Sequence, residues 1–127
     1  MHADGTRLNV LSGGVVDCAF IALNTLGAEF LEKVCENALA YELRKRRLAV
    51  AQQHGVTITY AGAVVGEYFV DLWVEESLLV ELKTVKALNE AHRGQCVNYL
   101  KANGLPLCPL LNFEEPRLGI KRVANRL

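Results

Sequence analysis

The stretch Gly66-Glu67-Tyr68-Phe69-Val70-Asp71-Leu72-Trp73-Val74, followed after Glu75-Glu76-Ser77 by Leu78-Leu79-Val80-Glu81-Leu82-Lys83-Thr84-Val85, decides the fold of this chain. Both halves are rich in the aromatic and β-branched residues that strands favour, and the polar triplet between them is typical of a turn. The pattern predicts a β-hairpin. Asp71, Glu81 and Lys83 are charged residues within these apolar strands, so they mark a candidate functional site.

The length of the turn sets which residues of the hairpin face one another. With a three-residue turn, Asp71 falls opposite Glu81, with Cβ atoms about 5 Å apart. Strand alternation then places Lys83 on the same face. A two-residue turn would put the two acids on opposite faces. The pairing of Asp71 with Glu81 on one face therefore requires an odd number of residues in the turn.

Two carboxylates held side by side on a half-buried sheet repel each other, and a divalent cation between them relieves that repulsion. Carboxylate oxygens favour hard ions such as Mg²⁺ or Mn²⁺. Such an ion activates water and polarises a phosphoryl oxygen, and a nearby ammonium such as Lys83 can orient that water. The pattern fits phosphodiester hydrolysis. The alternative is an ion pair between Glu81 and Lys83 on a solvated edge, although the flanking apolar residues favour a central strand.

Two helices are predicted before the hairpin. Apolar residues recur at helical spacing from Leu8 to Thr25, and a second amphipathic helix is predicted from about Ala28 to Leu48. Glu32 and Glu36 lie four residues apart on one side of the second helix. Either could deliver a third carboxylate to the metal, or serve on the helix surface or in an ion pair.

A third helix, predicted from Asn89 or Glu90 to Asn103-Gly104, carries a second candidate motif. Gln95 and Tyr99 are four residues apart and project from one face. Because this helix follows the Lys83 strand after a short connection, it can pack beside the same end of the sheet. A glutamine amide could position water or a phosphate oxygen, and a tyrosine could stack on a base. Standing alone, the pair would indicate only the margin of a packed helix.

The remaining segments complete an α/β fold, with a mixed central β-sheet flanked by helices. The chain from Ala49 to Val85 is strand-like and is punctuated at His54-Gly55 and Ala61-Gly62, which predicts a meander of three or four strands. Shorter strands are expected at 107–113 and 117–123. At 127 residues we expect one domain over 1–127, with frayed ends at 1–7 and 124–127.

The amino-acid composition limits which partners and which cellular compartment we expect for the protein. Fourteen basic and fourteen acidic residues give zero net charge, so a grip on nucleic acid must come from local patches. The strongest patch is the run Arg44-Lys45-Arg46-Arg47, which would equally complement a helix end. Further cations supplement it, namely Lys83, Lys86, Arg93 and Lys101 and later Arg117, Lys121, Arg122 and Arg126. Four widely spaced cysteines without a C-x-x-C pair indicate reduced core thiols and a cytoplasmic protein. No segment reads as long and apolar enough to span a membrane.

The order Asp71, Glu81-x-Lys83 and Gln95-x-x-x-Tyr99, after a helix bearing two glutamates, resembles the PD-(D/E)XK nuclease superfamily. The Q-x-x-x-Y helix resembles its RecB-like branch. From Leu11 to Val123 the chain is more closely similar to the small bacterial proteins of the GxxExxxR family. The segments that carry this similarity are Asn24-Thr25-Leu26-Gly27, Phe30 to Val34, Glu36 to Arg44, Gly66-Glu67-Tyr68, Asp71-Leu72, Val80 to Lys83, Gln95 to Lys101 and Leu111-Asn112-Phe113.

The resemblance implies a restriction-endonuclease-like core with a Mg²⁺ site that Mn²⁺ could also fill. It implies that Asp71 and Glu81 bind the metal and that Lys83 serves the attacking water. Glu36 would be the helical metal ligand, with Glu32 as the competing candidate.

The resemblance further implies that Gln95 and Tyr99 support a catalytic site that hydrolyses phosphodiester bonds. DNA is the expected substrate and RNA the alternative, with a homodimer or a larger complex as possible assemblies. A different reading is a catalytically inert module that keeps the fold and binds nucleic acid or a protein. A third is a hydrolase of nucleotides or other small phosphates.

Overall fold

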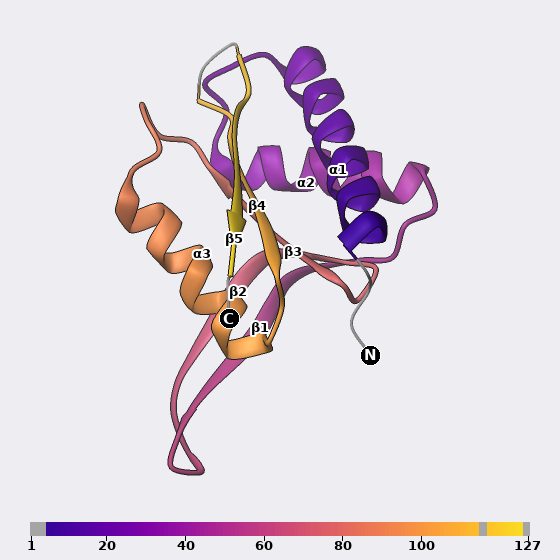
Figure 1. The fold of residues 1–127 in the computed structure, drawn as a ribbon. Coiled ribbons are helices and arrows are strands. Elements are labelled where there is room, and N and C mark those ends of the chain that lie inside the picture. Colours follow the sequence, from indigo (N-terminus) through magenta and orange to yellow (C-terminus); the bar gives the residue numbers. More distant parts are fainter. Residues whose placement is uncertain (1–4, 115–116, 126–127) are drawn as a thin grey trace.

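A computed structural model of the chain describes residues 5–114 and 117–125. Three helices and five strands form within these residues (Figure 1). In chain order they are α1 (Gly5–Leu26), α2 (Glu32–Lys45), β1 (Val50–Tyr60), β2 (Ala63–Val74), β3 (Leu78–Lys83), α3 (Glu90–Asn103), β4 (Leu107–Asn112) and β5 (Gly119–Ala124).

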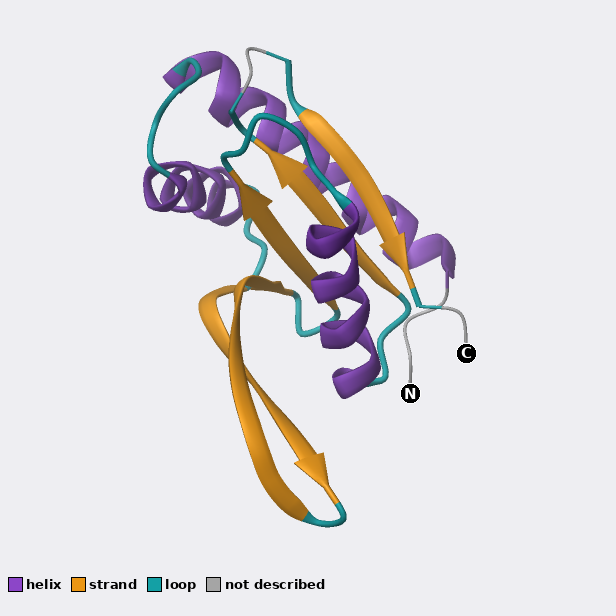
Figure 2. Cartoon of the chain, turned by 90° about the vertical axis from the view of Figure 1, so that its left-hand side faces the viewer, coloured by secondary structure: helices purple, strands orange, loops and turns teal. Residues whose placement is uncertain are grey.

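The described strands form a mixed sheet in the order β1-β2-β3-β4-β5. β3 and β4 are parallel and are joined by α3, as a crossover between parallel strands requires, whereas the other neighbours are antiparallel. Figure 2 shows α3 on one face of the sheet and α1 and α2 on the other. The predicted α/β class with a mixed central sheet is confirmed.

The sheet separates two apolar clusters, one under each helical layer. The cluster beneath α1 and α2 includes Val15, Leu39, Leu72, Leu82 and Phe113. The cluster beneath α3 includes Val70, Leu79, Tyr99, Leu110 and Val123. The first five residues of β3 are buried, so this strand is central and the predicted solvated-edge alternative for Glu81 does not apply.

Helix α2 is shorter than the predicted range from Ala28 to Leu48. Gly27, with φ of 83°, caps the end of α1, and Glu29 then takes a left-handed φ of 73° that a helix cannot include. At the other end Arg47, with φ of 63°, stops the helix after Lys45. The helix is shorter than predicted at both ends because residues other than glycine take left-handed φ values. The amino-acid composition does not reveal such values.

Strand β1 is also more continuous than predicted. His54-Gly55 does not form a turn, because Gly55 pairs with Phe69 and the His54 ring stacks on Trp73 with centroids 5.1 Å apart. The meander from β1 to β3 therefore has three strands. The β1–β2 hairpin extends beyond the helical layers, with its tip at Ala61-Gly62 (Figures 1 and 2).

The chain ends differ from the expected fraying at 1–7 and 124–127. Residues 5–7 belong to α1, and Ala124 ends β5. The Asn125 N–H donates to the Pro106 carbonyl at 3.0 Å. Residues 1–4 and 126–127 of the predicted frayed ends lie outside the described part of the chain.

Helix α1 corrects the expectation about membrane-spanning segments. Thr6–Leu26 is long and apolar enough to cross a membrane by length and composition alone. In this fold, however, 44% of the most apolar 18-residue window of that segment is buried, and Val15, Cys18 and Ala19 are fully enclosed in the cluster beneath α1 and α2. A core helix accounts for the same composition.

Helix α3 has the predicted bounds and defined caps. The Asn89 side chain accepts a hydrogen bond from the His92 N–H at 3.0 Å, and His92 Nδ1 accepts one from the Asn89 N–H at 3.2 Å. Gly104, with φ of 65°, ends the helix in the left-handed conformation that glycine tolerates. These caps fix the register in which the helix presents Gln95 and Tyr99.

The placement of α2 predicts a contrast between Leu39, within the helix, and Leu31, its N-cap residue. Leu39→Ala should lower the free energy of unfolding by about 2–5 kcal/mol, because it removes a fully buried side chain and leaves a cavity. Leu31→Ala, at a position 77% exposed, should change it by less than about 0.5 kcal/mol. Urea denaturation measures both, and equal losses would contradict the buried face of α2.

Candidate active site

The turn between β2 and β3 has the predicted three residues, Glu75 to Ser77. Pairing continues to Leu72 opposite Val80, so Asp71 and Glu81 are the next residues in register. The predicted register of the hairpin is therefore confirmed up to these two acids.

Backbone pairing between β2 and β3 stops there, and the two acids take over its hydrogen bonds. Glu81 Oε1 accepts from the Asp71 N–H at 2.9 Å, and Asp71 Oδ2 accepts from the Leu82 N–H at 2.8 Å. Beyond this point Glu81 to Lys83 pair with β4 instead. Each carboxylate thus satisfies a backbone donor of the opposite strand where the strands diverge.

The β1–β2 hairpin also changes faces at the level of Asp71. Leu72 lies in the cluster beneath α1 and α2, whereas Val70 lies in the cluster beneath α3. Residues two apart in a regular strand share a face, so the strand is turned over between them. Gln53, which faces Asp71 in the β1–β2 register, has a left-handed φ of 54°. The sheet is therefore locally distorted at the site.

One open pocket of about 430 Å³ collects every residue that the sequence predicted for the site. Its lining comprises Asp71 from β2, Glu81 and Lys83 from β3, Glu32 and Glu36 from α2, and Gln95 and Tyr99 from α3. Sequence reasoning missed three other lining residues, Lys33, Gln53 and Phe69. Elements far apart in the chain thus converge as the motif order predicted.

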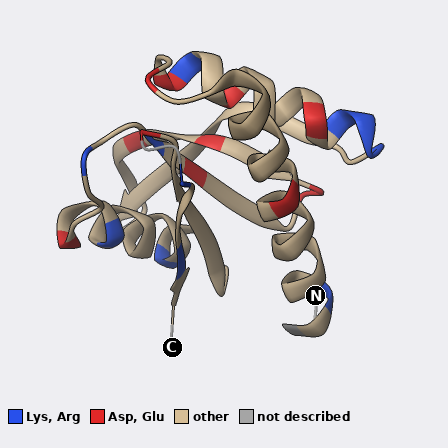
Figure 3. Ribbon diagram, turned by 90° about the horizontal axis from the view of Figure 1, so that it is seen from above, with Lys and Arg blue, Asp and Glu red and all other residues tan. Residues whose placement is uncertain are grey.

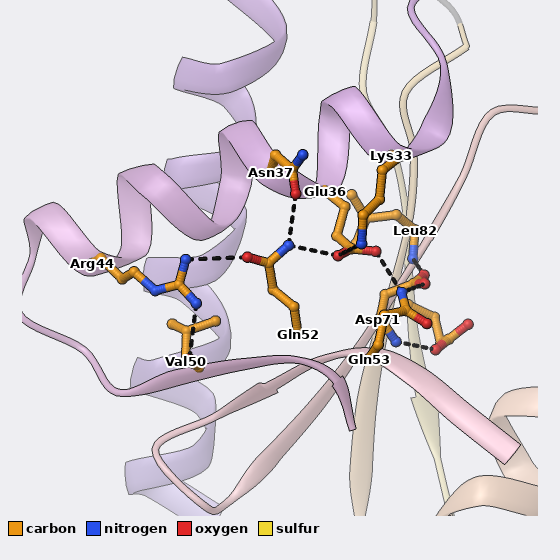
Figure 4. A network of polar contacts seen from close by, with 10 residues as sticks. Lys33, Glu36, Asn37, Arg44, Val50, Gln52, Gln53, Asp71 and Leu82 are labelled. Atoms are coloured by element: carbon orange, nitrogen blue, oxygen red, sulfur yellow. Dashed lines mark hydrogen bonds and ion pairs between the residues drawn. The ribbon is translucent and has the colours of Figure 1, made fainter. Parts of the chain in front are cut away.

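Glu36 is the more firmly held of the two helical acids. It is 2% exposed, and its Oε2 accepts from Lys33 Nζ at 2.9 Å and from Gln52 Nε2 at 2.6 Å (Figure 4). Its Oε1 accepts from Gln53 Nε2 at 2.6 Å. These donors compensate the carboxylate for the water that burial removes. Glu32, half-buried, reaches the same pocket one turn earlier.

A chain of amides connects Glu36 to the rest of the fold. Gln52 Nε2 also donates to Asn37 Oδ1 at 2.7 Å, and Gln52 Oε1 accepts from Arg44 at 3.1 Å. Arg44 in turn donates to the Val50 carbonyl at 3.1 Å. Figure 4 shows this network between α2 and β1. It ties the start of β1 to the helix that carries the acids.

Burial and crowding of negative charge govern protonation in the pocket. Burial, with the Asp71 charge as the next cause, raises the pKa of Glu81 to about 9. Burial also raises the pKa of Asp71, against its hydrogen bonds from Leu82 and Gln53, and that of Glu32. Burial and the neighbouring Glu81 charge raise the pKa of Tyr99, which keeps its hydroxyl protonated. These shifts favour a proton or a cation among the acids.

The oxygen donors of the pocket suit a hard divalent cation, although the side chains do not lie close enough together to form a complete metal site. In the described residues, no group of three His, Cys, Asp or Glu side chains lies close enough to hold a metal ion. Four carboxylates nevertheless line the pocket, and oxygen donors are those that Mg²⁺ and Mn²⁺ prefer. Asp71 and Glu81, with Glu36 or Glu32, are the residues that would hold such an ion.

Comparison with known families identifies the fold. The family model of the PD-(D/E)XK nuclease superfamily matches residues 9–123. The chain belongs to the PD-(D/E)XK nuclease superfamily. The predicted superfamily is thereby confirmed, and nuclease-like function is indicated at that general level. No curated protein is significantly similar to the chain.

A solved structure shows the same architecture. The chain resembles the protein in "Crystal structure of SSO0001" with a TM-score of 0.59 and 17% sequence identity. The match covers 75% of this PD-(D/E)XK chain and 50% of the other, so this chain spans about half of that protein's length. At this identity the likeness supports the fold alone.

The raised pKa of Glu81 predicts how stability depends on pH in EDTA. Between about pH 5 and pH 9 the folded protein keeps a proton on Glu81 that the unfolded chain, with a pKa near 4.5, has released. The folded state binds more protons in this window, so the free energy of unfolding should fall as pH rises.

Scanning calorimetry at pH 5, 7 and 9 measures this effect as a decrease in Tm. Glu81→Gln should flatten the decrease, because the amide does not titrate, whereas Glu76→Gln at the exposed turn should leave it unchanged. The same slope in Glu81→Gln as in the wild type would contradict the assignment.

Proposed function

We propose that this protein is a metal-dependent nuclease that hydrolyses phosphodiester bonds in DNA, with RNA as the alternative substrate. The observation that carries the proposal is the meeting of Asp71, Glu81, Lys83 and the Gln95–Tyr99 pair in one pocket, together with acids from α2. A chance set of surface charges has no reason to converge from four separate elements.

Asp71 and Glu81, with Glu36 as the helical ligand, would hold Mg²⁺ or Mn²⁺. Such an ion, when bound, lowers the pKa of water and polarises the phosphoryl group. Glu36 is favoured over Glu32 because an amide already links Glu36 to Asp71, through hydrogen bonds of 2.6 and 3.2 Å. Glu32 remains close enough to accept a hydrogen bond from a water in the pocket.

The other pocket residues orient the reactants. The Lys83 ammonium donates to the attacking water or to a phosphate oxygen, where it stabilises developing negative charge. The Gln95 amide positions water. The Tyr99 side chain is 4% exposed and packs on Tyr68 with ring centroids 5.7 Å apart, so its protonated hydroxyl is held in place as a donor.

We propose that the chain belongs to the RecB-like branch of the PD-(D/E)XK superfamily and, more narrowly, to the GxxExxxR family. The Gln95-x-x-x-Tyr99 motif supports this placement, because both side chains line the pocket with the acids. A cytoplasmic setting is supported by the four cysteines, Cys18, Cys35, Cys96 and Cys108, which are free and buried.

The basic run Arg44 to Arg47 is poorly placed to guide a substrate into the pocket. It lies at the end of α2 opposite to Glu32, about 20 Å away by the rise of a 14-residue helix (Figure 3). Arg44 is also engaged by Gln52 and Val50. Arg44, the first residue of this run, therefore has a structural role near β1.

Cations from separate segments gather instead between α3 and β5 (Figure 3). Two hollows, lined by successive residues of β5 and together termed the α3–β5 groove, are each lined by three cations and, among the described residues, by no acid. The cations are Lys86, Arg117 and Lys121 in the first hollow and Arg93, Lys101 and Arg122 in the second.

The groove begins beside the active-site strand. Asn112, which pairs with Lys83 in the β3–β4 register, lines the first hollow. Six residues of β5 span about 20 Å, which accommodates several successive phosphates. We propose that this groove binds the phosphate backbone of the nucleic acid, since a chain of zero net charge must use a local concentration of cations.

Cleavage assays test the catalytic proposal. Purified protein with Mg²⁺ or Mn²⁺ should cut at least one of single-stranded DNA, double-stranded DNA, branched DNA and RNA. Lys83→Ala should lower the rate by about 10²-fold or more, because it removes charge stabilisation. Metal-independent cleavage that survives in Asp71→Ala would refute the mechanism. A panel of nucleotides in the same assay tests the small-phosphate alternative.

Calorimetry separates the nuclease from the inert module. The wild type should bind Mn²⁺ at millimolar concentration or below, and Asp71→Ala should lose that binding. An absence of binding in the wild type would favour a module that keeps the fold without catalysis.

Neutralising the groove should weaken substrate binding without harming the chemistry. Lys101→Gln with Arg122→Gln should lower the affinity for a single-stranded oligonucleotide and reduce its salt dependence by about 0.7 per lost phosphate contact. Hydrolysis of the small diester bis(p-nitrophenyl) phosphate should stay unchanged, because it does not reach the groove.

The matched control is Arg46→Gln with Arg47→Gln, which removes the same charge at the end of α2. Fluorescence anisotropy across a salt series measures both pairs. Equal weakening by the two pairs would mean that overall charge, and not the α3–β5 groove, determines binding.

A further inference from the structure

Gln53 stands between two acids of the candidate active site. Its single amide nitrogen, Nε2, donates to Glu36 Oε1 at 2.6 Å and to Asp71 Oδ1 at 3.2 Å (Figure 4). It therefore joins a carboxylate on α2 to one on β2. The positive ends of its two N–H bonds occupy the position between carboxylates at which a bridging cation would lie.

Gln53 binds one oxygen of each acid, Glu36 Oε1 and Asp71 Oδ1. The second oxygen of each acid is already occupied by donors elsewhere in the fold. Those donors are Lys33 and Gln52 for Glu36 Oε2, and the Leu82 N–H for Asp71 Oδ2. A metal shared by the two acids therefore competes with Gln53 for the same pair of oxygens.

The spacing set by an amide differs from the spacing set by a metal. The two hydrogens of an NH₂ group diverge by about 120°, which places the two acceptor oxygens about 5 Å apart at the observed bond lengths. Mg²⁺ binds oxygen at about 2.0–2.1 Å, so two of its ligands lie at most about 4 Å apart. Metal binding by both acids requires them to close in and the amide to leave.

The backbone of Gln53 is held in a costly conformation for this contact. Its φ of 54° lies in the left-handed region, inside strand β1. The other described non-glycine residues with such φ values lie in turns, at a helix end or between elements; they are Glu29, Arg47, Ala61, Glu75 and Glu76. Gln53 is also exposed, so its side chain has room to rotate away from the acids.

We propose that Gln53 is an internal stand-in for the metal ion. Its amide holds Glu36 and Asp71 together when no metal is bound, and it swings out when a metal takes its place. This inference rests on the proposed metal site and adds a regulatory property to it. Because the metal must displace the amide, Gln53 sets the metal concentration at which the site forms.

Replacing Gln53 should lower the thermal stability of the metal-free protein and raise its affinity for the metal. Gln53→Ala should lower Tm in EDTA, because two crowded acids lose their shared donor. The same change should tighten the apparent Kd for Mn²⁺ by about tenfold, because the ion no longer displaces a hydrogen bond to a charged group. Scanning calorimetry and titration calorimetry measure the two quantities without any activity assay.

Gln52→Ala is the matched control. Gln52 is the adjacent residue of the same type and donates to the same acid at 2.6 Å, but it bonds to Asn37 and Arg44 rather than to Asp71. Its loss should lower Tm without tightening Mn²⁺ binding. Gln53→Asn is a second variant at the site, because asparagine tolerates left-handed φ but is too short to bridge both acids. It should tighten Mn²⁺ binding as alanine does.

Side-chain NMR gives an independent measurement. The chain has three glutamines, and the Gln53 amide signal can be identified by its loss in Gln53→Ala. Saturation with Mg²⁺ should move this signal toward the position of a solvated amide, while the Gln52 signal changes less. An unchanged Gln53 signal in a protein saturated with Mg²⁺ would overturn the displacement.

The outcomes separate this inference from the proposed function. Mn²⁺ binding by the wild type that is weaker or unchanged in Gln53→Ala would overturn the stand-in role and leave the nuclease proposal intact. Binding by Gln53→Ala but not by the wild type would support the stand-in role. Failure of both proteins to bind Mn²⁺ at millimolar concentration would overturn both proposals.

Discussion

The site depends on the hydrogen bonds that the Asp71 and Glu81 carboxylates accept from backbone N–H groups of the opposite strand, from Leu82 and Asp71 respectively. Each carboxylate accepts the backbone N–H that the opposite strand loses where β2 and β3 part, at 2.9 and 2.8 Å. The acids are therefore structural parts of the sheet as well as candidate ligands. This dual role explains why two carboxylates persist side by side in a buried setting that raises the pKa of both.

The point at which β2 and β3 diverge also determines where the neighbouring elements lie. β3 leaves β2 to pair with β4, which brings α3 and its Gln95 and Tyr99 across the same end of the strand. On the other side, the distorted backbone at Gln53 turns the hairpin over and places an amide between β2 and α2. Local strain, strand divergence and a concentration of like charge coincide, as they do at functional sites.

Much of this arrangement was predictable from the sequence, because periodicity fixes faces and turn length fixes register. The three-residue turn predicted Asp71 opposite Glu81, and helical spacing put Gln95 beside Tyr99. Gln53 was not predictable, because a two-residue turn at Ala61-Gly62 would place Gln52 opposite Asp71, and a bulge at Ile58/Thr59 shifts the register by one. The six cations of the α3–β5 groove stand out as basic residues in the sequence, but their gathering along β5 was hidden, since only tertiary packing brings their segments together.

A crystal structure of the protein soaked with Mn²⁺, read by its anomalous signal, would locate the ion relative to the acids of the pocket. We expect one strong peak bound by Asp71 and Glu81, with Glu36 completing the protein ligands and the Gln53 amide turned away. A pocket without a peak at millimolar Mn²⁺, or an ion held elsewhere without Asp71 and Glu81, would contradict this expectation.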